Sequence, residues 1–223
     1  MVLLQIVDST ATAGAHSSIN LFELVIKGGW IMLPIGLLAV IAIYLMIERF
    51  ITISRASRVD NSFLTNVKTM LMDGKIDAAL SMCRSTNTPI ARLIEKGIKR
   101  LGKPIKEIES AVENTGKLEI YKLEKNLSYL GIIAGIAPMI GFIGTISGVI
   151  MIFYDISQQN GDISIKIISD GLYVKMVTSA AGLLVGIIAH IGFHYLNAMI
   201  DRVSFQLEST TVEFIDLIQE PGK

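Results

Sequence analysis

The stretch LGIIAGIAPMIGFIGTISGVIMIF, residues 130–153, decides the fold class of this 223-residue chain. It lies inside an uncharged run that extends from Asn126 to Tyr154. As a helix rising about 1.5 Å per residue, this run would be roughly 43 Å long, which exceeds a hydrocarbon core of about 30 Å. The sequence therefore predicts a membrane-spanning helix that tilts or protrudes from the bilayer.

Two further uncharged runs have the length of a membrane crossing. One lies between Lys27 and Glu48 and supplies about the 20 apolar residues that a helix needs to cross hydrocarbon. The other extends from Met176 to Ile200. The whole chain is 51% hydrophobic and only 18% charged, and its mean hydropathy is +0.55, which is too apolar for an ordinary soluble domain. We therefore predict an all-α, polytopic membrane protein with three transmembrane helices and long helices that extend into the cytoplasm.

The distribution of basic residues predicts the orientation. Fifteen of the 20 Lys and Arg residues lie in segment 48–125, against ten acidic residues, whereas segment 154–165 contains Asp155 and Asp162 and no base. Loops rich in Lys and Arg stay on the cytoplasmic side of a membrane. We therefore expect the large loop and the C-terminal tail to be cytoplasmic and the N-terminus to be periplasmic.

Inside the large loop, helical patterns cover 61–72, 77–84 and 89–101, and a charged helix begins near Lys103-Pro104. We expect this last helix to continue directly into the second span. The tail from Asp201 to Ile218 also has a helical pattern. The resulting division of the chain is a periplasmic N-terminal segment with an interfacial helix (1–26), a first transmembrane helix (27–53), a cytoplasmic helical loop (54–125), a second transmembrane helix (126–154), a periplasmic loop (155–166), a third transmembrane helix (167–197) and a cytoplasmic helical tail (198–223).

Small residues recur along one side of each of the last two spans. Such residues let the backbone of another helix come close, so we expect tight packing within the chain and between copies of it. Packing alone is one explanation of the pattern. The residues are Ala137, Gly141, Gly144 and Gly148 in the second span, and Ser179, Gly182 and Gly186 in the third.

Hydroxyl groups in the same spans admit a second explanation. Thr145, Ser179 and the adjacent Thr178 can line a narrow wet path, although such hydroxyls also bond back to carbonyls of their own helix. A proton relay through hydrocarbon needs a group that titrates, normally a carboxylate or histidine. Neither span contains an Asp or Glu well inside it, so a proton-conducting role would require a carboxylate from elsewhere, naturally from a partner helix.

The remaining polar residues support no other chemistry. His190 and His194 stand one turn apart with no evident third ligand, so we interpret them as interfacial or interior polar residues and predict no metal and no cofactor. Lys175 near the outer end of the third span either extends toward the headgroups or forms an ion pair with Asp170 or with an acidic residue of a partner. Cys83, the single cysteine, is expected to be a buried, inert thiol.

Three segments resemble the ExbB/TolQ/MotA proton-channel family, and within it the ExbB/TolQ branch. KGGWIMLPIGLLAVIAIYLMIER (27–49) is similar to the family's first span, and SDGLYVKMVTSAAGLLVGIIA (169–189) to its third, whose hydroxyl-Ala-x-Gly-Leu pattern includes Ser179 and Gly182. The most specific match is an Ala-Pro-x-x-Gly-x-x-Gly-Thr-x-x-Gly run, which corresponds here to Ala137, Pro138, Gly141, Gly144, Thr145 and Gly148.

This resemblance implies a homopentamer whose second and third spans surround the single transmembrane helices of a smaller ExbD- or TolR-like partner. The partner would carry the membrane aspartate, facing the hydroxyls of Thr145 and Ser179, with Thr178 adjacent. Proton passage would deliver work to a TonB-like or TolA-like protein from the inner membrane of a Gram-negative bacterium, without enzymatic activity. The motifs do not separate ExbB from TolQ, or protons from sodium ions.

The chain departs from the family pattern in three places. Val174, followed by Lys175, stands where many relatives have Glu, which affects an ion pair usual in the family. Ile188 replaces a Pro, and Phe193-His194 replaces Tyr-Asn. Among the alternatives, a flagellar or gliding stator normally has four spans, a solute transporter more often shows repeated halves, and a structural scaffold leaves the signature without a role.

Overall fold

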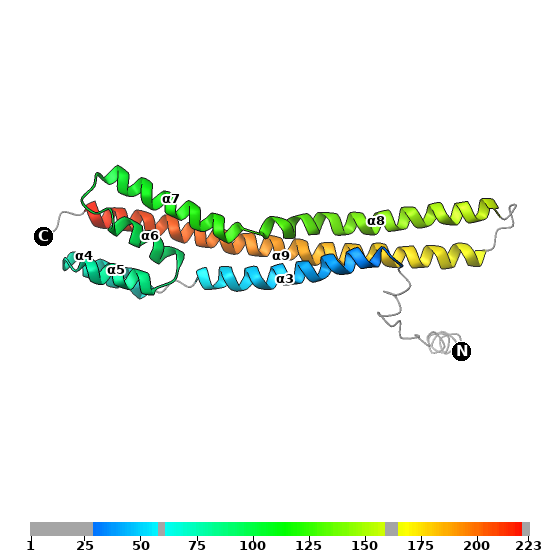
Figure 1. Ribbon diagram of the computed structural model, residues 1–223, viewed down its shortest axis with the longest axis horizontal. Coiled ribbons are helices and arrows are strands. Elements are labelled where there is room, and N and C mark those ends of the chain that lie inside the picture. The colour runs from blue at the N-terminus through cyan, green and yellow to red at the C-terminus, as the bar shows by residue number, and fades with distance from the viewer. Residues whose placement is uncertain (1–28, 58–60, 159–164, 220–223) are drawn as a thin grey trace, which may run out of the picture. The chain divides into compact units, whose positions relative to one another are not determined.

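A computed structural model describes residues 29–57, 61–158 and 165–219 of the chain. All regular elements in these ranges are α-helices, and three helical stretches are long and apolar enough to cross a membrane. The prediction of an all-α membrane protein with three spanning helices is therefore confirmed. The predicted interfacial helix in 1–26 lies outside the described residues. In chain order the helices are α3 (Met32–Ala56), α4 (Asn61–Met72), α5 (Ile76–Ser85), α6 (Pro89–Ile98), α7 (Ile105–Glu124), α8 (Leu127–Gln158) and α9 (Ile165–Gln219) (Figure 1).

The short helices α4, α5 and α6 have bounds close to those predicted from the sequence. Helix α6 illustrates why, because Thr88 caps its N-terminus by accepting a hydrogen bond from the Ala91 amide at 3.3 Å, and Pro89 occupies the first turn. Its apolar side is buried, including Leu93 and Ile94. Local capping signals and burial of one apolar side therefore agree in this segment.

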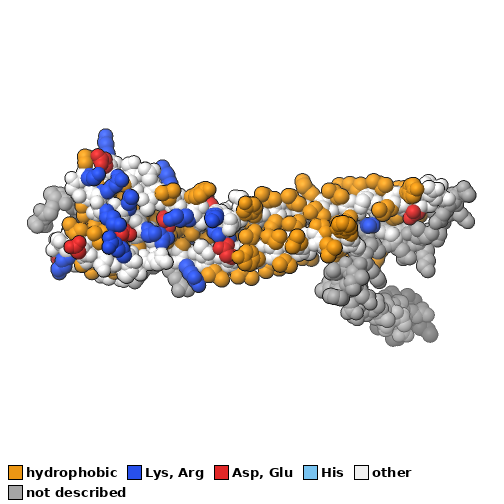
Figure 2. Space-filling view, viewed as in Figure 1, with side chains coloured by type: hydrophobic (Ala, Val, Ile, Leu, Met, Phe, Trp, Pro, Cys, Tyr) orange, Lys and Arg blue, Asp and Glu red, His pale blue; other side chains and the backbone are white. Residues whose placement is uncertain are grey.

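The chain divides into two compact units, and the larger one comprises Leu38–Ile136 with Val185–Lys223. Its core contains side chains from several helices that are at most 3% exposed, among them Ile53, Val112 and Leu130. Charged side chains gather on the surface of α4 to α7 in this unit, whereas hydrophobic side chains cover much of the visible surface of α3 and α8 (Figure 2). Much of the apolar surface thus belongs to helices that are long and apolar enough to cross a membrane.

A buried carboxylate links α6 to α7 in the larger unit. Glu119 is 3% exposed, and its Oε2 accepts hydrogen bonds from Arg92 Nε at 2.9 Å and Nη2 at 2.6 Å. Its Oε1 accepts from Lys122 Nζ at 2.6 Å. Burial raises the pKa of Glu119, but the hydrogen bonds from Arg92 and Lys122 outweigh burial and hold the pKa below its ordinary value. The carboxylate is therefore ionised at neutral pH.

The prediction that the charged helix continues directly into the second span was wrong. Helix α7 ends at Glu124, and α8 begins at Leu127 after a break of two residues. Asn126 adopts the left-handed conformation with φ of 67°, which Asn tolerates better than most residues. Arg49 Nη1 donates a 3.4 Å hydrogen bond to the Lys122 carbonyl in the last turn of α7. The break thus falls where the charges stop and the uncharged run begins.

The smaller unit comprises Met1–Leu37 with Ala137–Leu184. Its described part contains most of α8, which continues to Gln158, and the first portion of α9, which begins at Ile165. Helix α9 is continuous through Gln219, so the predicted helical tail is the end of the same helix. The small residues identified from the sequence lie mostly in this smaller unit.

Candidate functional site: the contact between α8 and α9

Helices α8 and α9 approach each other through glycines. A Cβ atom built on Gly141 would lie 3.2 Å from the Cα and carbonyl oxygen of Ser179. A Cβ built on Gly182 would lie 2.6 Å from the Ala137 carbonyl oxygen and 3.0 Å from the Gly141 Cα. Because these are backbone atoms, no side-chain rotation can relieve the overlap. The two backbones therefore touch directly, as small residues permit.

The contact extends along α8 in both directions from Gly141. Ala137, Gly144 and Gly148 are buried at spacings of three and four residues, which places them on one side of the helix. Gly186 is also buried, in the part of α9 that belongs to the larger unit. Pro138 is half-buried inside α8 and has no backbone N–H, so the Ala134 carbonyl loses its usual helical partner.

The predicted pore hydroxyls lie beside this contact. Thr178 is fully buried, and its Cγ2 would lie 3.3 Å from a Cβ on Gly144. Thr145 is half-buried, and its hydroxyl donates to the Phe142 carbonyl at 2.8 Å, with the Gly141 carbonyl at 3.4 Å. Ser179 is half-buried on α9. In the single chain the Thr145 proton is thus directed to its own helix, and a rotation about one bond would redirect it.

Lys175 lies across Gly148. The Cγ, Cδ and Cε atoms of Lys175 all lie so close to Gly148 that a Cβ on this glycine would overlap them. The lysine is half-buried and stands one turn before Thr178 and Ser179 on α9. The aliphatic part of Lys175 therefore packs between two helices instead of extending freely from one of them. Val174 is part of α9, and its side chain lies outside the described structure.

The two histidines lie in the larger unit. The rings of His190 and His194 have their centroids 4.4 Å apart in an edge-to-face arrangement, and both residues are exposed. No group of three or more His, Cys, Asp or Glu side chains suited to a metal converges in the described ranges. Cys83 is buried, as expected, and burial followed by the nearby Glu95 charge raises its pKa to about 11.

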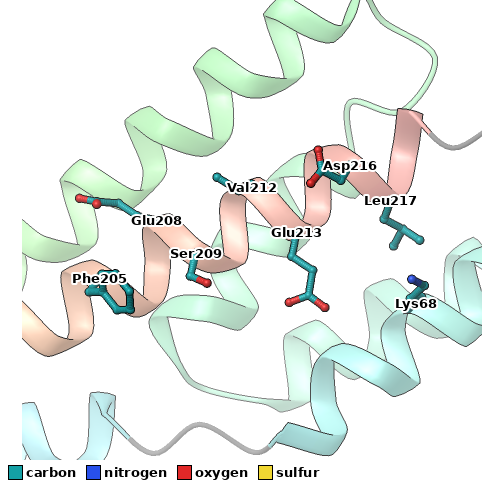
Figure 3. A pocket seen from close by; sticks show the side chains of 8 residues that line it. All are labelled: Lys68, Phe205, Glu208, Ser209, Val212, Glu213, Asp216 and Leu217. Carbon is teal, nitrogen blue, oxygen red and sulfur yellow. The ribbon is translucent and has the colours of Figure 1, made fainter.

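Two cavities flank the C-terminal part of α9 in the larger unit. One of about 530 Å³ lies between α9 and Lys68 of α4, and Figure 3 shows Glu213 and Leu217 on the side of α9 nearer Lys68, with Glu208 and Asp216 on another side. The second, of about 780 Å³, lies between α7 and α9. Both have mixed apolar and acidic linings, and Glu208 and Asp216 contribute to both. Neither arrangement joins a nucleophile to a base, and the hydroxyls of Thr145 and Ser179 lie elsewhere.

The position of Lys175 against Gly148 was not anticipated from the sequence. Both residues were identified separately, Gly148 as a packing residue and Lys175 as a terminal cation. Their contact depends on the register between α8 and α9, which the sequence of neither helix specifies. The sequence signal that could have revealed this contact is a charged residue at the same depth as a glycine on the facing span.

A comparison with models of known protein families identifies the family of this chain. Residues 85–209, more than half of the chain, match the MotA/TolQ/ExbB proton channel family. The matched region includes α8, most of α9 and the whole contact between them.

Several relatives carry ExbB names. The chain is 36% identical over 90 residues to biopolymer transport protein exbB1 of Vibrio cholerae, covering 40% of each protein. It is 26% identical over 189 residues to a putative biopolymer transport protein ExbB homolog of Methanothermobacter thermautotrophicus, covering 82% of this chain and 66% of that protein. It is 37% identical over 82 residues to biopolymer transport protein ExbB of Helicobacter pylori, covering 37% of this chain and 56% of that protein.

The alignments thus span less than two thirds of each of these three relatives. The family match is broader than the individual alignments to the Vibrio and Helicobacter proteins, because it covers more than half of the present chain. The chain is an ExbB-like member of the MotA/TolQ/ExbB proton channel family.

Proposed function

We propose that this chain is the pore-forming subunit of a membrane motor of the ExbB–ExbD or TolQ–TolR type, driven by the proton motive force. Its role is to let protons pass beside Thr145 and Ser179 and to convert their passage into work on the cell envelope. The work energises TonB-dependent outer-membrane transport or the Tol-Pal system. The chain itself catalyses no chemical reaction.

One observation carries this proposal. Thr145 and Ser179 belong to helices whose backbones touch at Gly141 and Gly182, and neither of the two uncharged runs around them, 126–154 and 176–200, contains an Asp or Glu. A hydroxyl can donate and accept a hydrogen bond, but it cannot hold or release a proton near neutral pH. The wall of the path is therefore provided by this chain, and the titrating carboxylate by another protein.

The proposed assembly rests on the resemblance to the family. Several copies, five by resemblance to the family, surround the single transmembrane helices of an ExbD- or TolR-like partner that carries a membrane Asp. A TonB-like or TolA-like protein receives the work. The assembly lies in the inner membrane of a Gram-negative bacterium, with the N-terminus of this chain periplasmic and its C-terminus cytoplasmic.

Substitution of Thr145 by Val tests the proposal. The change removes the hydroxyl and retains the branched shape, so the complex should assemble. Proton-dependent work should fall about tenfold or more, because a hydrogen bond to a charged group contributes about 1.5–3 kcal/mol. The measurement is proton uptake into vesicles that contain the chain and the single-span protein with which it copurifies. Thr52→Val is the matched control, because Thr52 on α3 also donates to a carbonyl of its own helix, at 2.9 Å.

Full proton uptake by the Thr145→Val complex would exclude Thr145 from the path. Equal losses in the Thr145 and Thr52 variants would show that the effect is on folding rather than on conduction. Replacing the proton gradient by a sodium gradient in the same vesicles identifies the ion.

A further inference from the structure

Lys175 is a cation without an ion pair among the residues that the structure describes, and the side chain of Asp170, its expected partner within the chain, lies outside them. Lys175 belongs to the third membrane span. Charged groups within membranes are costly, and proteins keep them where they pair with another charge or line a polar path. A functional partner for Lys175 therefore has to be considered.

The aliphatic stem of Lys175 is packed against α8. A lysine can bury its methylene groups along apolar surface while its ammonium reaches a polar or charged group. Here the Cγ, Cδ and Cε atoms of Lys175 all lie against Gly148 of α8, and the Cε would be 2.6 Å from a Cβ on that glycine. The Nζ atom is one bond of about 1.5 Å beyond this Cε, so the ammonium lies within that distance of the stem that packs on Gly148.

The Lys175 stem can lie against α8 only because Gly148 has no side chain. Any side chain at residue 148 would occupy the space that the lysine stem fills. On the same helix, Gly135 has no other atom within 4 Å of its Cβ position, so glycine at 135 serves no comparable purpose. The pair Gly148 and Lys175 thus holds a positive charge one turn away from Thr178 and Ser179 on α9.

We propose that the ammonium of Lys175, held in place by the bare surface of Gly148, is a binding site for a carboxylate carried by the transmembrane helix of another protein. This inference rests on the proposed function, in which the two spans meet an external carboxylate. The ammonium forms an ion pair with that carboxylate in its charged state and thereby positions it beside the hydroxyls of Thr145 and Ser179. The chain supplies both the hydroxyl wall and the counter-charge.

The test measures binding of two synthetic peptides to the full-length chain in lipid nanodiscs. Each peptide is an apolar helix of about 20 residues, long enough to cross the bilayer, and carries a single Asp or a single Asn at the depth of Lys175. The wild-type chain should bind the Asp peptide about tenfold more tightly than the Asn peptide, because a charge-assisted hydrogen bond is stronger than a neutral one. Lys175→Met should abolish this preference, and Lys175→Arg should retain it.

Gly148→Ala separates position from charge. This variant keeps the ammonium but displaces its stem, so the preference for the Asp peptide should fall, whereas Gly135→Ala should leave it unchanged. Equal binding of the two peptides by the wild-type chain, or no binding of either, overturns the inference. An undiminished preference in Lys175→Met also overturns it.

The outcome is distinguishable from failure of the proposed function. If proton uptake depends on Thr145 but the Asp peptide is not preferred, the carboxylate site at Lys175 is wrong and the proton path stands. If the Asp peptide is preferred but the complex takes up no protons, the site stands and the motor function is wrong.

Discussion

At the scale of single residues, Gly182 has the strictest environment in the contact between α8 and α9. Its Cβ position lies 2.6 Å from the Ala137 carbonyl oxygen, so Gly182→Ala must separate two helix backbones. We expect a loss of about 1–3 kcal/mol in the free energy of unfolding, which is typical of overpacking. Thermal unfolding in detergent measures this change.

Gly135→Ala is the matched control for that substitution. Its Cβ would meet no atom within 4 Å, and alanine favours a helix over glycine by about 0.5–1 kcal/mol, so stability should stay equal or rise. A smaller loss for Gly182→Ala than for Gly135→Ala would contradict the contact between the two backbones.

Glu119 makes stability depend on pH. Its pKa is lowered in the folded state, so its contribution is fully present above the pKa of the unfolded chain and is lost as the pH falls through the folded-state pKa. Glu119→Gln should therefore lower the unfolding free energy at pH 7 by about 1–3 kcal/mol, the range for a hydrogen bond to a charged group. The difference between variant and wild type should shrink as the pH drops below about 4, near the ordinary Glu pKa.

Glu124→Gln provides the comparison, because Glu124 is exposed and belongs to none of the ion pairs found in the described residues. Unfolding by denaturant at pH 7 and at pH 3.5 measures both variants. A constant difference between Glu119→Gln and wild type at the two pH values would mean that the carboxylate charge contributes no stability.

At the scale of elements, the break between α7 and α8 depends on Asn126. The left-handed conformation at φ of 67° is tolerated by Asn and is a genuine outlier for a branched residue. Asn126→Val should destabilise the chain by about 1–2 kcal/mol, whereas Asn126→Gly should be close to neutral. Circular dichroism during denaturation compares the two, and equal stability of the Val and Gly variants would show that the two helices can join without cost.

The same break shows what the sequence could and could not predict. The start of α6 was predictable because the Thr88-Pro89 pair is a local signal. The end of α7 was not predictable, because Lys125-Asn126 contains neither Gly nor Pro. Arg49 donates a hydrogen bond to the last turn of α7, but it lies more than seventy residues earlier in the sequence.

In the candidate site too, local features were predictable from the sequence and long-range contacts were not. The spacing of Ala137, Gly141, Gly144 and Gly148 on one helix side was readable from the sequence, because helical periodicity is a local property. The pairing of Gly148 with Lys175 was not readable, because it depends on how far α9 slides along α8. The hydrogen bonds of Thr145 also required coordinates, since its hydroxyl can serve either its own helix or a neighbour.

At the scale of the whole molecule, the orientation can be tested with a chain that has one native thiol. Cys83 is 2% exposed and its pKa is raised to about 11, so it should react poorly with maleimide at pH 7, where the thiolate is the reactive form. New cysteines at the exposed positions Ser157 and Ser209 report the two sides.

We expect Ser157→Cys to react with an impermeant maleimide in intact spheroplasts, because residue 157 lies at the predicted periplasmic end of α8. Ser209→Cys should react only after the membrane is opened. Labelling of both positions from the same side would contradict the number of crossings between them, and exchanged accessibility would reverse the orientation.

The bare surface of Gly182 also has a genetic consequence. Every single-base change in a glycine codon that alters the amino acid adds at least a methyl group, and here even a methyl group would meet the carbonyl oxygen of Ala137. Every missense change at this codon should therefore disturb the contact between α8 and α9, because no other side chain is small enough to fit. In a saturation mutagenesis library selected for function, codon 182 should retain only synonymous changes, while codon 135 of the same gene should accept substitutions freely.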